Sequence, residues 1–96
     1  MKYTFHPHAE KELTETENYY NDISEELGTR FRQEIAATIS RISKFPRGCQ
    51  PLTRIHRRCR LSNFPYGIVY ELNPTEFRVV AVTHLRRESD YWMYRT

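Results

Sequence analysis

The sequence predicts a small α+β domain in which an antiparallel sheet packs against an N-terminal helical hairpin, in the order β-α-α-β-β-β. Three observations support this fold class. Apolar residues recur at helical spacing in two stretches of the first half of the chain, and apolar and polar residues alternate in the second half. The 96 residues are enough for one hydrophobic core but too few for two. Residues 1–96 are therefore expected to form a single domain.

The chain is expected to open with a strand that leads directly into a helix. Tyr3 and Phe5 alternate with polar neighbours, which is typical of a strand, and Pro7 stands where a helix takes its first residue. From Ala9 to Leu27 the residues of the expected apolar face recur every three or four positions, mostly with Glu, Asn and Lys between them: Ala9, Leu13, Thr16, Tyr20, Ile23 and Leu27. This pattern predicts one amphipathic helix with an acidic outer face.

A second helix is predicted after Gly28. This glycine interrupts the periodicity of the first helix, and Thr29 can cap a new one. Apolar residues then return at helical spacing until Pro46 and Gly48 stop the helix; they are Phe31, Ile35, Ile39, Ile42 and Phe45. The apolar faces of the two helices cannot be covered by each other alone, so the hairpin needs a sheet to pack against.

The second half of the chain is expected to supply the sheet. Residues 54–61 alternate between two sides of a strand, one expected to be partly buried and the other to carry charge: Ile55, Arg57, Cys59 and Leu61 against Arg54, His56, Arg58 and Arg60. Turn residues separate the strands that follow, and sequential antiparallel strands form a meander. These strands are 68–72 and 77–83, after which residues 91–95 are predicted to form one helical turn or an aromatic tail packed on the domain.

Charge is distributed unevenly along the chain. Residues 1–27 carry two basic and seven acidic side chains, a net charge of −5, whereas residues 28–96 carry thirteen basic and five acidic ones, a net charge of +8. The asymmetry favours a polyanion or an acidic protein as partner of the second part, and a solvated basic surface is the alternative. Residues 41–60 hold seven basic residues and no acidic one but cross a helix end, a loop and a strand, so they are not expected to form a DNA-recognition helix.

The composition predicts a cytoplasmic protein without membrane association. Residues 1–7 lack the apolar core of a signal peptide, and no run approaches the roughly 18 apolar residues of a membrane span. Cys49 and Cys59 match neither a redox motif nor a zinc-ligand pair, so free thiols are expected. No metal and no cofactor is predicted, because His6, His8 and His56 show no metal-ligand spacing with cysteine or acidic residues.

Motifs along the whole chain occur in an order and spacing typical of one protein superfamily. They are Tyr19-Tyr20, the Leu27-Gly28 break, the Phe31/Ile35/Ile39/Phe45-Pro46 helix, Arg57-Arg58, Phe64-Pro65-Tyr66 with Ile68 and Tyr70, Ala81-Val82 with His84, and Arg87 followed by Tyr91-Trp92 and Arg95. The chain resembles the RelE/ParE toxins, which include toxins of plasmid stabilisation systems. The resemblance implies the toxin of a type II toxin–antitoxin system, neutralised by a cognate antitoxin with which it would form a hetero-oligomer.

Gly67 favours one of the two branches that this superfamily contains. One branch cuts mRNA on the ribosome and usually carries an arginine just after the position equivalent to Tyr66, where this chain has Gly67. The other, ParE-like branch poisons DNA gyrase without cutting RNA. We therefore expect a gyrase poison. The alternatives are a ribosome-dependent mRNA endoribonuclease, with Arg58 or Arg60 as the substitute phosphate contact, and a degenerate member without toxicity.

Residues for metal-free RNA cleavage are nevertheless present. Such cleavage needs groups that remove and donate a proton, and fixed cations that stabilise the charge on the phosphate. A histidine can titrate near neutrality, arginines can hold phosphate, and a tyrosine can stack on a base or assist proton transfer. The candidates are His84, Arg58, Arg60, Arg87 and Tyr91.

A second set of residues is predicted to bind the target, gyrase or the ribosome and mRNA, or the antitoxin. It consists of Arg57, Arg58, Arg60, Arg86, Arg87, Trp92 and Arg95. The first three alternate along one strand, so they cannot all face one ligand, and charges on an edge strand also prevent aggregation. Tyr91 and Trp92 can instead close the core.

Overall fold

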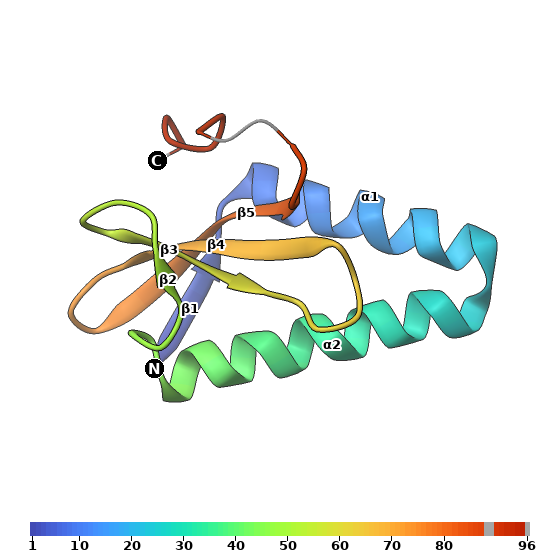
Figure 1. The fold of residues 1–96 in the computed structure, drawn as a ribbon, viewed down its shortest axis with the longest axis horizontal. Helices are drawn as coiled ribbons and strands as arrows, with labels where there is room; N and C mark the ends of the chain where they lie inside the picture. Colours follow the sequence, from blue (N-terminus) through green and yellow to red (C-terminus); the bar gives the residue numbers. More distant parts are fainter. Residues whose placement is uncertain (88–89, 96) are drawn as a thin grey trace.

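Two helices cover one face of a five-stranded sheet in the computed structural model, which describes residues 1–87 and 90–95 (Figure 1). The strands lie side by side in the order β1-β5-β4-β3-β2. The predicted α+β class is confirmed. Along the chain the elements are β1 (Lys2–Phe5), α1 (Pro7–Ile23), α2 (Glu25–Lys44), β2 (Gln50–Pro51), β3 (His56–Arg60), β4 (Tyr66–Leu72) and β5 (Glu76–His84).

The predicted antiparallel arrangement holds for β2 to β5, but β1 makes the sheet mixed. This first strand lies parallel to β5, from Lys2 opposite Glu76 to Phe5 opposite Val79. Alternation of apolar and polar residues indicates that a strand exists, but it does not say which strand is its partner or in which direction the two run. The short strand β2, which pairs with β3 at the opposite edge, is also absent from the predicted elements.

The break between the helices lies at Ser24, earlier than the predicted break at Gly28. The extended backbone of Ser24 ends α1, and its hydroxyl accepts a hydrogen bond from the backbone N–H of Leu27 at 3.1 Å, which caps α2. Gly28 and Thr29 therefore lie inside α2. A Cβ at Gly28 would lie 2.8 Å from the Cβ and 2.9 Å from the Cα of Asn21, so the glycine permits the close approach of the two helices.

The main core lies between the hairpin and the sheet. Its fully buried side chains include Phe31 and Ile42 of α2, Tyr70 of β4 and Phe77 of β5, and burial of each such side chain contributes roughly 1.5–3 kcal/mol. Three residues assigned to buried faces from the sequence are instead exposed: Ile23, Phe45 and Ile55 are 58%, 66% and 48% exposed. All three lie at or beyond the ends of their elements.

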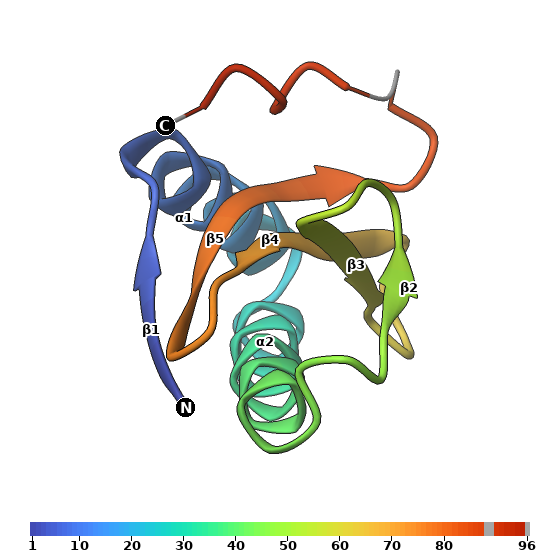
Figure 2. The same ribbon diagram turned by 90° about the vertical axis from the view of Figure 1, so that its left-hand side faces the viewer.

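The other face of the sheet is partly covered by the C-terminal segment, residues 90–95. Figure 2 shows this segment running above β5 to the beginning of α1. It consists of consecutive turns, in which the N–H of Met93 donates to the carbonyl of Asp90 and that of Arg95 to the carbonyl of Trp92. The segment packs on the sheet, as expected for the aromatic tail that was one of the two predicted alternatives. In the part of the chain that the structure describes, neither helix has the length and apolar character needed to cross a membrane.

Candidate functional site

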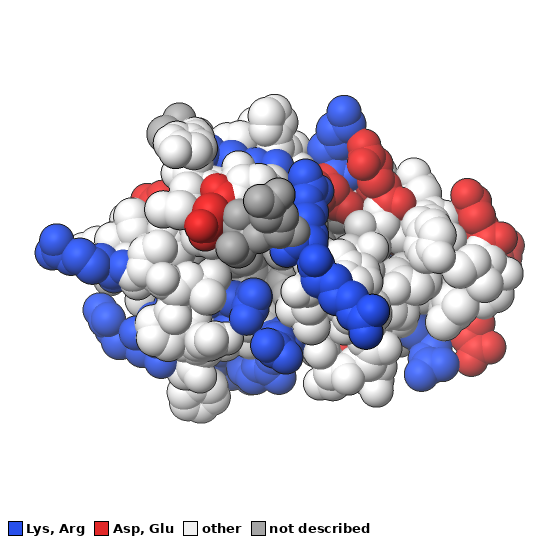
Figure 3. All heavy atoms as spheres, turned by 45° about the horizontal axis from the view of Figure 1, so that its top comes forward, with Lys and Arg blue, Asp and Glu red and all other residues white. Residues whose placement is uncertain are grey.

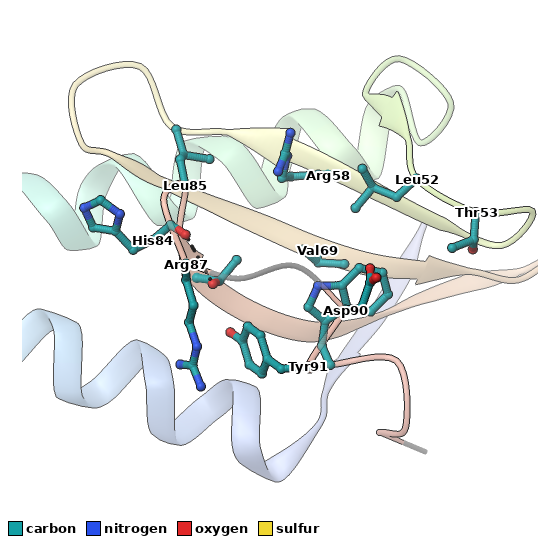
Figure 4. Close-up of a pocket in the computed structure, with 11 residues that line it drawn as sticks. Leu52, Thr53, Arg58, Val69, His84, Leu85, Arg87, Asp90 and Tyr91 are labelled. Atoms are coloured by element: carbon teal, nitrogen blue, oxygen red, sulfur yellow. Dashed lines mark hydrogen bonds between the residues drawn. The ribbon is translucent and has the colours of Figure 1, made fainter.

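A cavity of about 230 Å³ opens on the sheet face opposite the helices, beside the C-terminal segment (Figure 4). Its floor includes Val69 of β4 and Thr83 of β5, and Arg58 of β3 forms part of its wall. The remaining lining residues come from the loop after β2, from the last residue of β5 and from the chain that follows it: Leu52, Thr53, His84, Leu85, Arg87, Asp90, Tyr91 and Trp92. Five residues of the two predicted sets, Arg58, His84, Arg87, Tyr91 and Trp92, therefore line one cavity.

Arg58 is the candidate with unused hydrogen-bonding capacity at this cavity. One guanidinium nitrogen, Nη2, donates to Oε1 of Gln50 at 3.1 Å, whereas the buried Nε has no partner among the described residues. Gly67 makes room for this side chain. A Cβ at position 67 would lie 3.1 Å from Cγ and 3.2 Å from Cδ of Arg58, and 3.3 Å from Leu85. The position of the Arg58 side chain thus depends on the lack of a side chain at Gly67.

The other predicted arginines of β3 do not join Arg58 in the cavity. Arg57 points to the opposite side of the strand, where its Nη1 donates to the carbonyls of Arg47 at 2.9 Å and Cys49 at 2.8 Å. Arg60 is exposed near the end of the sheet, and its carbonyl accepts a hydrogen bond from Arg41. The predicted alternation therefore separates Arg57 from the cavity, but it does not account for Arg60, which lies outside the cavity lining although it is two residues from Arg58.

His84 lies at the end of β5 with its ring directed away from the other labelled residues (Figure 4). Its Nδ1 accepts a hydrogen bond from the backbone N–H of Arg86 at 3.0 Å, so a neutral ring carries its proton on Nε2. The ring packs edge-on against Tyr66 at a centroid distance of 5.1 Å. The exposed side chain of Arg86 does not line the cavity.

Glu12 of α1 is the residue that the sequence analysis missed. Its carboxylate accepts hydrogen bonds from the hydroxyl of Tyr91 at 2.8 Å, from two nitrogens of Arg95 at 2.9 and 3.1 Å, and from the N–H of Val82 at 3.0 Å. Arg87 approaches the same carboxylate at 3.7 Å. Three predicted site residues thus converge on one acidic side chain, and we call these five residues the Glu12 network.

The Glu12 network occupies the part of the β5 edge that β1 does not reach. Pairing with β1 ends at Val79, and Val80 forms a bulge because the β4 partners on either side of it belong to Val79 and Ala81. The carbonyl of Val80 accepts a hydrogen bond from Arg95 at 2.9 Å, and the N–H of Val82 donates one to Glu12. An ion pair therefore takes the place of a neighbouring strand.

The hydroxyl of Tyr91 is held in this network as a hydrogen-bond donor. Burial is the largest cause that raises the pKa of its hydroxyl, and the hydrogen bond to Glu12 and the charge of that carboxylate act in the same direction. The guanidinium carbon of Arg87 lies 3.7 Å from the centre of the Tyr91 ring, on its face. Both candidates are therefore fixed by contacts with α1 and with each other.

Trp92 packs inside the protein. Only 3% of its surface is exposed, and it forms a second, smaller core with Val69, Val80 and Ala81 on the outer sheet face. Its ring lies 4.7 Å from that of His56, which is also buried. The structure thus places Trp92 and Arg95, both predicted to bind a partner, in contacts that hold the C-terminal segment to the sheet.

His56 beneath Trp92 is expected to make stability depend on pH. Burial lowers its pKa from the ordinary value of 6.5, against the smaller opposing effect of Glu71, whose carboxylate lies 4.0 Å from Nε2. As pH falls through the unfolded pKa the unfolded chain binds a proton that the folded state takes up only at lower pH, so stability is lost. The free energy of unfolding of wild type, measured in urea, should therefore fall more between about pH 8 and about pH 5.5 than that of His56→Gln.

Other histidines contribute equally to the pH dependence of both proteins. His6, whose pKa is also lowered, mainly by burial, is present in both proteins, so its contribution cancels in the difference. A difference between wild type and His56→Gln that does not change with pH, or that grows as pH falls, would show that His56 is not held neutral in the folded state.

Charges on the surface separate along the molecule. In Figure 3, Lys and Arg side chains spread over the middle and left, where the sheet lies, and Asp and Glu gather mainly at the right, at the turn between α1 and α2. On the face that Figure 3 shows, the charge asymmetry of the sequence is therefore also an asymmetry in space. Within residues 1–87 and 90–95, no three His, Cys, Asp or Glu side chains cluster as metal ligands would.

Comparisons with known proteins agree with this architecture. A solved structure titled "Chromosomal ParDE TA system from P. aeruginosa" matches with a TM-score of 0.74 at 15% sequence identity, over 88% of this chain and 95% of that chain, and this likeness shows the fold. A search of curated protein sequences finds no match. The family model described as "ParE toxin of type II toxin-antitoxin system, parDE" matches residues 3–89. The resemblance to the RelE/ParE toxins is confirmed, and the chain belongs to the ParE toxin family of type II toxin–antitoxin systems.

Proposed function

We propose that this toxin acts in the bacterial cytoplasm by poisoning DNA gyrase, and that a cognate antitoxin binds and neutralises it. The Glu12 network is the observation that favours gyrase poisoning over RNA cleavage. RNA cleavage needs side chains that are free to contact phosphate and to move protons. Arg87 and Tyr91 are instead bound to Glu12, and the ring of His84 is directed away from the other labelled residues of the cavity (Figure 4). A poison that acts by binding needs only a fixed surface.

The antitoxin is proposed to bring an acidic segment to the basic side of the sheet. Residues 28–96 carry a net charge of +8, and the cavity on that side is bordered by Arg58 and Arg87. Electrostatic attraction of this kind increases the rate of association and weakens with salt. The resulting hetero-oligomer should therefore form more slowly as the salt concentration rises.

A ribosome-dependent endoribonuclease is the second candidate, and one observation favours it. The buried Nε of Arg58 has no hydrogen-bond partner within the described ranges, and it belongs to a cavity whose border carries His84 and Arg87. A phosphate oxygen would satisfy this donor. A degenerate member without toxic activity is the third candidate.

One pair of assays separates the three candidates. The full-length toxin is incubated with gyrase, ATP and supercoiled DNA, and in parallel with ribosomes that carry a translated mRNA. We expect linear, gyrase-bound DNA to accumulate with toxin concentration while the mRNA remains intact. Cut mRNA without gyrase-linked DNA breaks would establish the ribonuclease, and the absence of both products would establish the degenerate member.

Arg58 provides the matched variant for the gyrase assay. Arg58→Ala is expected to require roughly tenfold more toxin for the same amount of cleaved DNA, about 1.4 kcal/mol, because arginines at the centre of an interface often contribute this much. Arg30→Ala is the control, since Arg30 is an exposed arginine on α2, on the helical side of the molecule. Equal potency of the two variants would exclude Arg58 from the gyrase contact.

A further inference from the structure

Cys49 directly precedes β2, and Cys59 lies in the neighbouring strand β3. The register pairs Gln50 with Arg58 and Pro51 with Arg57, and its extension by one residue would set Cys49 opposite Cys59. Residues opposite each other on antiparallel strands have Cα atoms about 4.5–5.5 Å apart, within the range of about 4.4–6.8 Å that disulfides span. Both thiols are free, and Cys59 is close enough to Cys49 to help raise the pKa of the Cys49 thiol.

The two sulfurs differ in their surroundings. Nη2 of Arg41 donates a hydrogen bond to Sγ of Cys59 at 3.0 Å, and a guanidinium in this position stabilises a thiolate more than a thiol. This contact is the largest cause that raises the pKa of Arg41, which therefore remains charged. Burial, followed by the contact with Cys59, raises the pKa of Cys49 to about 11, so Cys49 remains a thiol near neutrality.

A surface hollow of about 350 Å³ gives access to this pair. Arg41, Cys49, Cys59 and Gly48 are among its lining residues. Cys49 is only partly buried, whereas Cys59 is 4% exposed and is reached from the hollow only by a small molecule. Hydrogen peroxide is an oxidant of suitable size.

We propose that Cys49 and Cys59 form a redox modification site, at which hydrogen peroxide converts the two thiols into an intramolecular disulfide. The Cys59 thiolate attacks one peroxide oxygen, the O–O bond breaks, and the products are a sulfenic acid and hydroxide. The sulfur of Cys49 then attacks the sulfenic sulfur, and the S–S bond forms as water leaves. Two thiols and one peroxide thus give one disulfide and two waters.

The disulfide would join the segment after α2 to the strand that carries Arg58. Arg57 already holds the carbonyl of Cys49 at 2.8 Å, so the bond would form without a large movement of this segment. Arg58 follows Arg57 directly and lies in the cavity wall. The proposal does not depend on gyrase as the target, and its test uses no activity assay.

The test is oxidation of the reduced, full-length protein with hydrogen peroxide near pH 7. Remaining thiols are alkylated, and the intact mass and the non-reduced peptide map are measured. We expect a monomer lighter by two hydrogens, no alkylation, and a cross-linked peptide with Cys49 and Cys59, all reversed by dithiothreitol. Two alkylated thiols, a disulfide between two chains, or oxidation to sulfonic acid alone would overturn the proposal.

Two single-cysteine variants test the assigned order of the steps. Cys49→Ser should stop at the sulfenic acid of Cys59, which dimedone captures, because no second thiol is available. Cys59→Ser should react with peroxide at least several-fold more slowly than Cys49→Ser, because the remaining thiol has a raised pKa. Equal rates would show that the Cys59 thiolate does not begin the reaction.

Arg41 is tested as a positioning residue. Arg41→Gln should slow disulfide formation roughly five- to tenfold, whereas Arg41→Lys, which keeps the positive charge, should restore part of the rate. Arg30→Gln on the same helix is the matched control, and thermal unfolding by circular dichroism confirms that each variant is folded. If Arg41→Gln does not fold, the rate of Arg41→Lys decides, because loss of the rate with the charge retained contradicts the assigned role.

Discussion

Replacing Glu12 with alanine is expected to lower the free energy of unfolding by about 3–5 kcal/mol, because it leaves a buried charge without its partner. The side chains of Glu12 and Arg95 are only 14% and 13% exposed, and their ion pair has a separation of 2.9 Å. The change also removes the acceptor for the N–H of Val82 and for the hydroxyl of Tyr91. Urea unfolding followed by circular dichroism measures the loss.

Glu15→Ala is the matched control for this prediction. Glu15 lies on the same helix and carries the same charge, but its side chain is 64% exposed and its pair with Lys11 has a separation of 3.9 Å. An exposed pair of this kind contributes about 0.5 kcal/mol or less. Glu12→Gln, which keeps an oxygen for Val82 but loses the charge, should fall between the two. A similar small loss for Glu12→Ala and Glu15→Ala would show that the network does not stabilise the fold.

Periodicity predicted most of the main core. Phe31, Ile35, Ile39 and Ile42 stand at helical spacing in the sequence, and all four are buried in the structure. The boundary between the helices was wrong because Gly28 looked like a helix terminator. The lack of a side chain at Gly28 instead permits the close approach to Asn21. This is a contact between two helices, which a local sequence pattern does not reveal.

The candidate site was only partly predictable, because its contacts join distant parts of the chain. Alternation along one strand was enough to separate Arg57 from Arg58. Arg87, Tyr91 and Arg95 looked like free ligand-binding residues because the sequence does not show that they share a distant partner, Glu12, which lies 83 residues before Arg95. A signal did exist. Glu12 stands three residues after Ala9 and four before Thr16, both of which are buried, so it lies on the packing face of α1.

The C-terminal segment is thus held by a polar and an apolar anchor. The polar one is the Glu12 network at the edge of β5, and the apolar one is Trp92 on the outer face of the sheet. The cavity lies beside this segment and takes several of its lining residues from it. Any partner that binds in the cavity therefore contacts a surface whose shape depends on both anchors.

Trp92→Ala is expected to lower the free energy of unfolding by about 3–5 kcal/mol, the usual loss when a buried tryptophan is truncated. Trp92 is 3% exposed and covers Val69, Val80 and Ala81, and its removal would also uncover His56. Because Trp92 is the one tryptophan of the sequence, its variant has no tryptophan fluorescence, and unfolding is followed by circular dichroism.

Tyr94→Ala is the matched control, since Tyr94 is an aromatic residue of the same segment but is 91% exposed. Its substitution should change stability by no more than about 0.5 kcal/mol. A Trp92→Ala protein that keeps wild-type stability but no longer produces gyrase-linked DNA breaks would identify Trp92 as a target contact that leaves its pocket on binding. A large loss of stability together with the loss of activity would instead mean that Trp92 acts by shaping the cavity beside it.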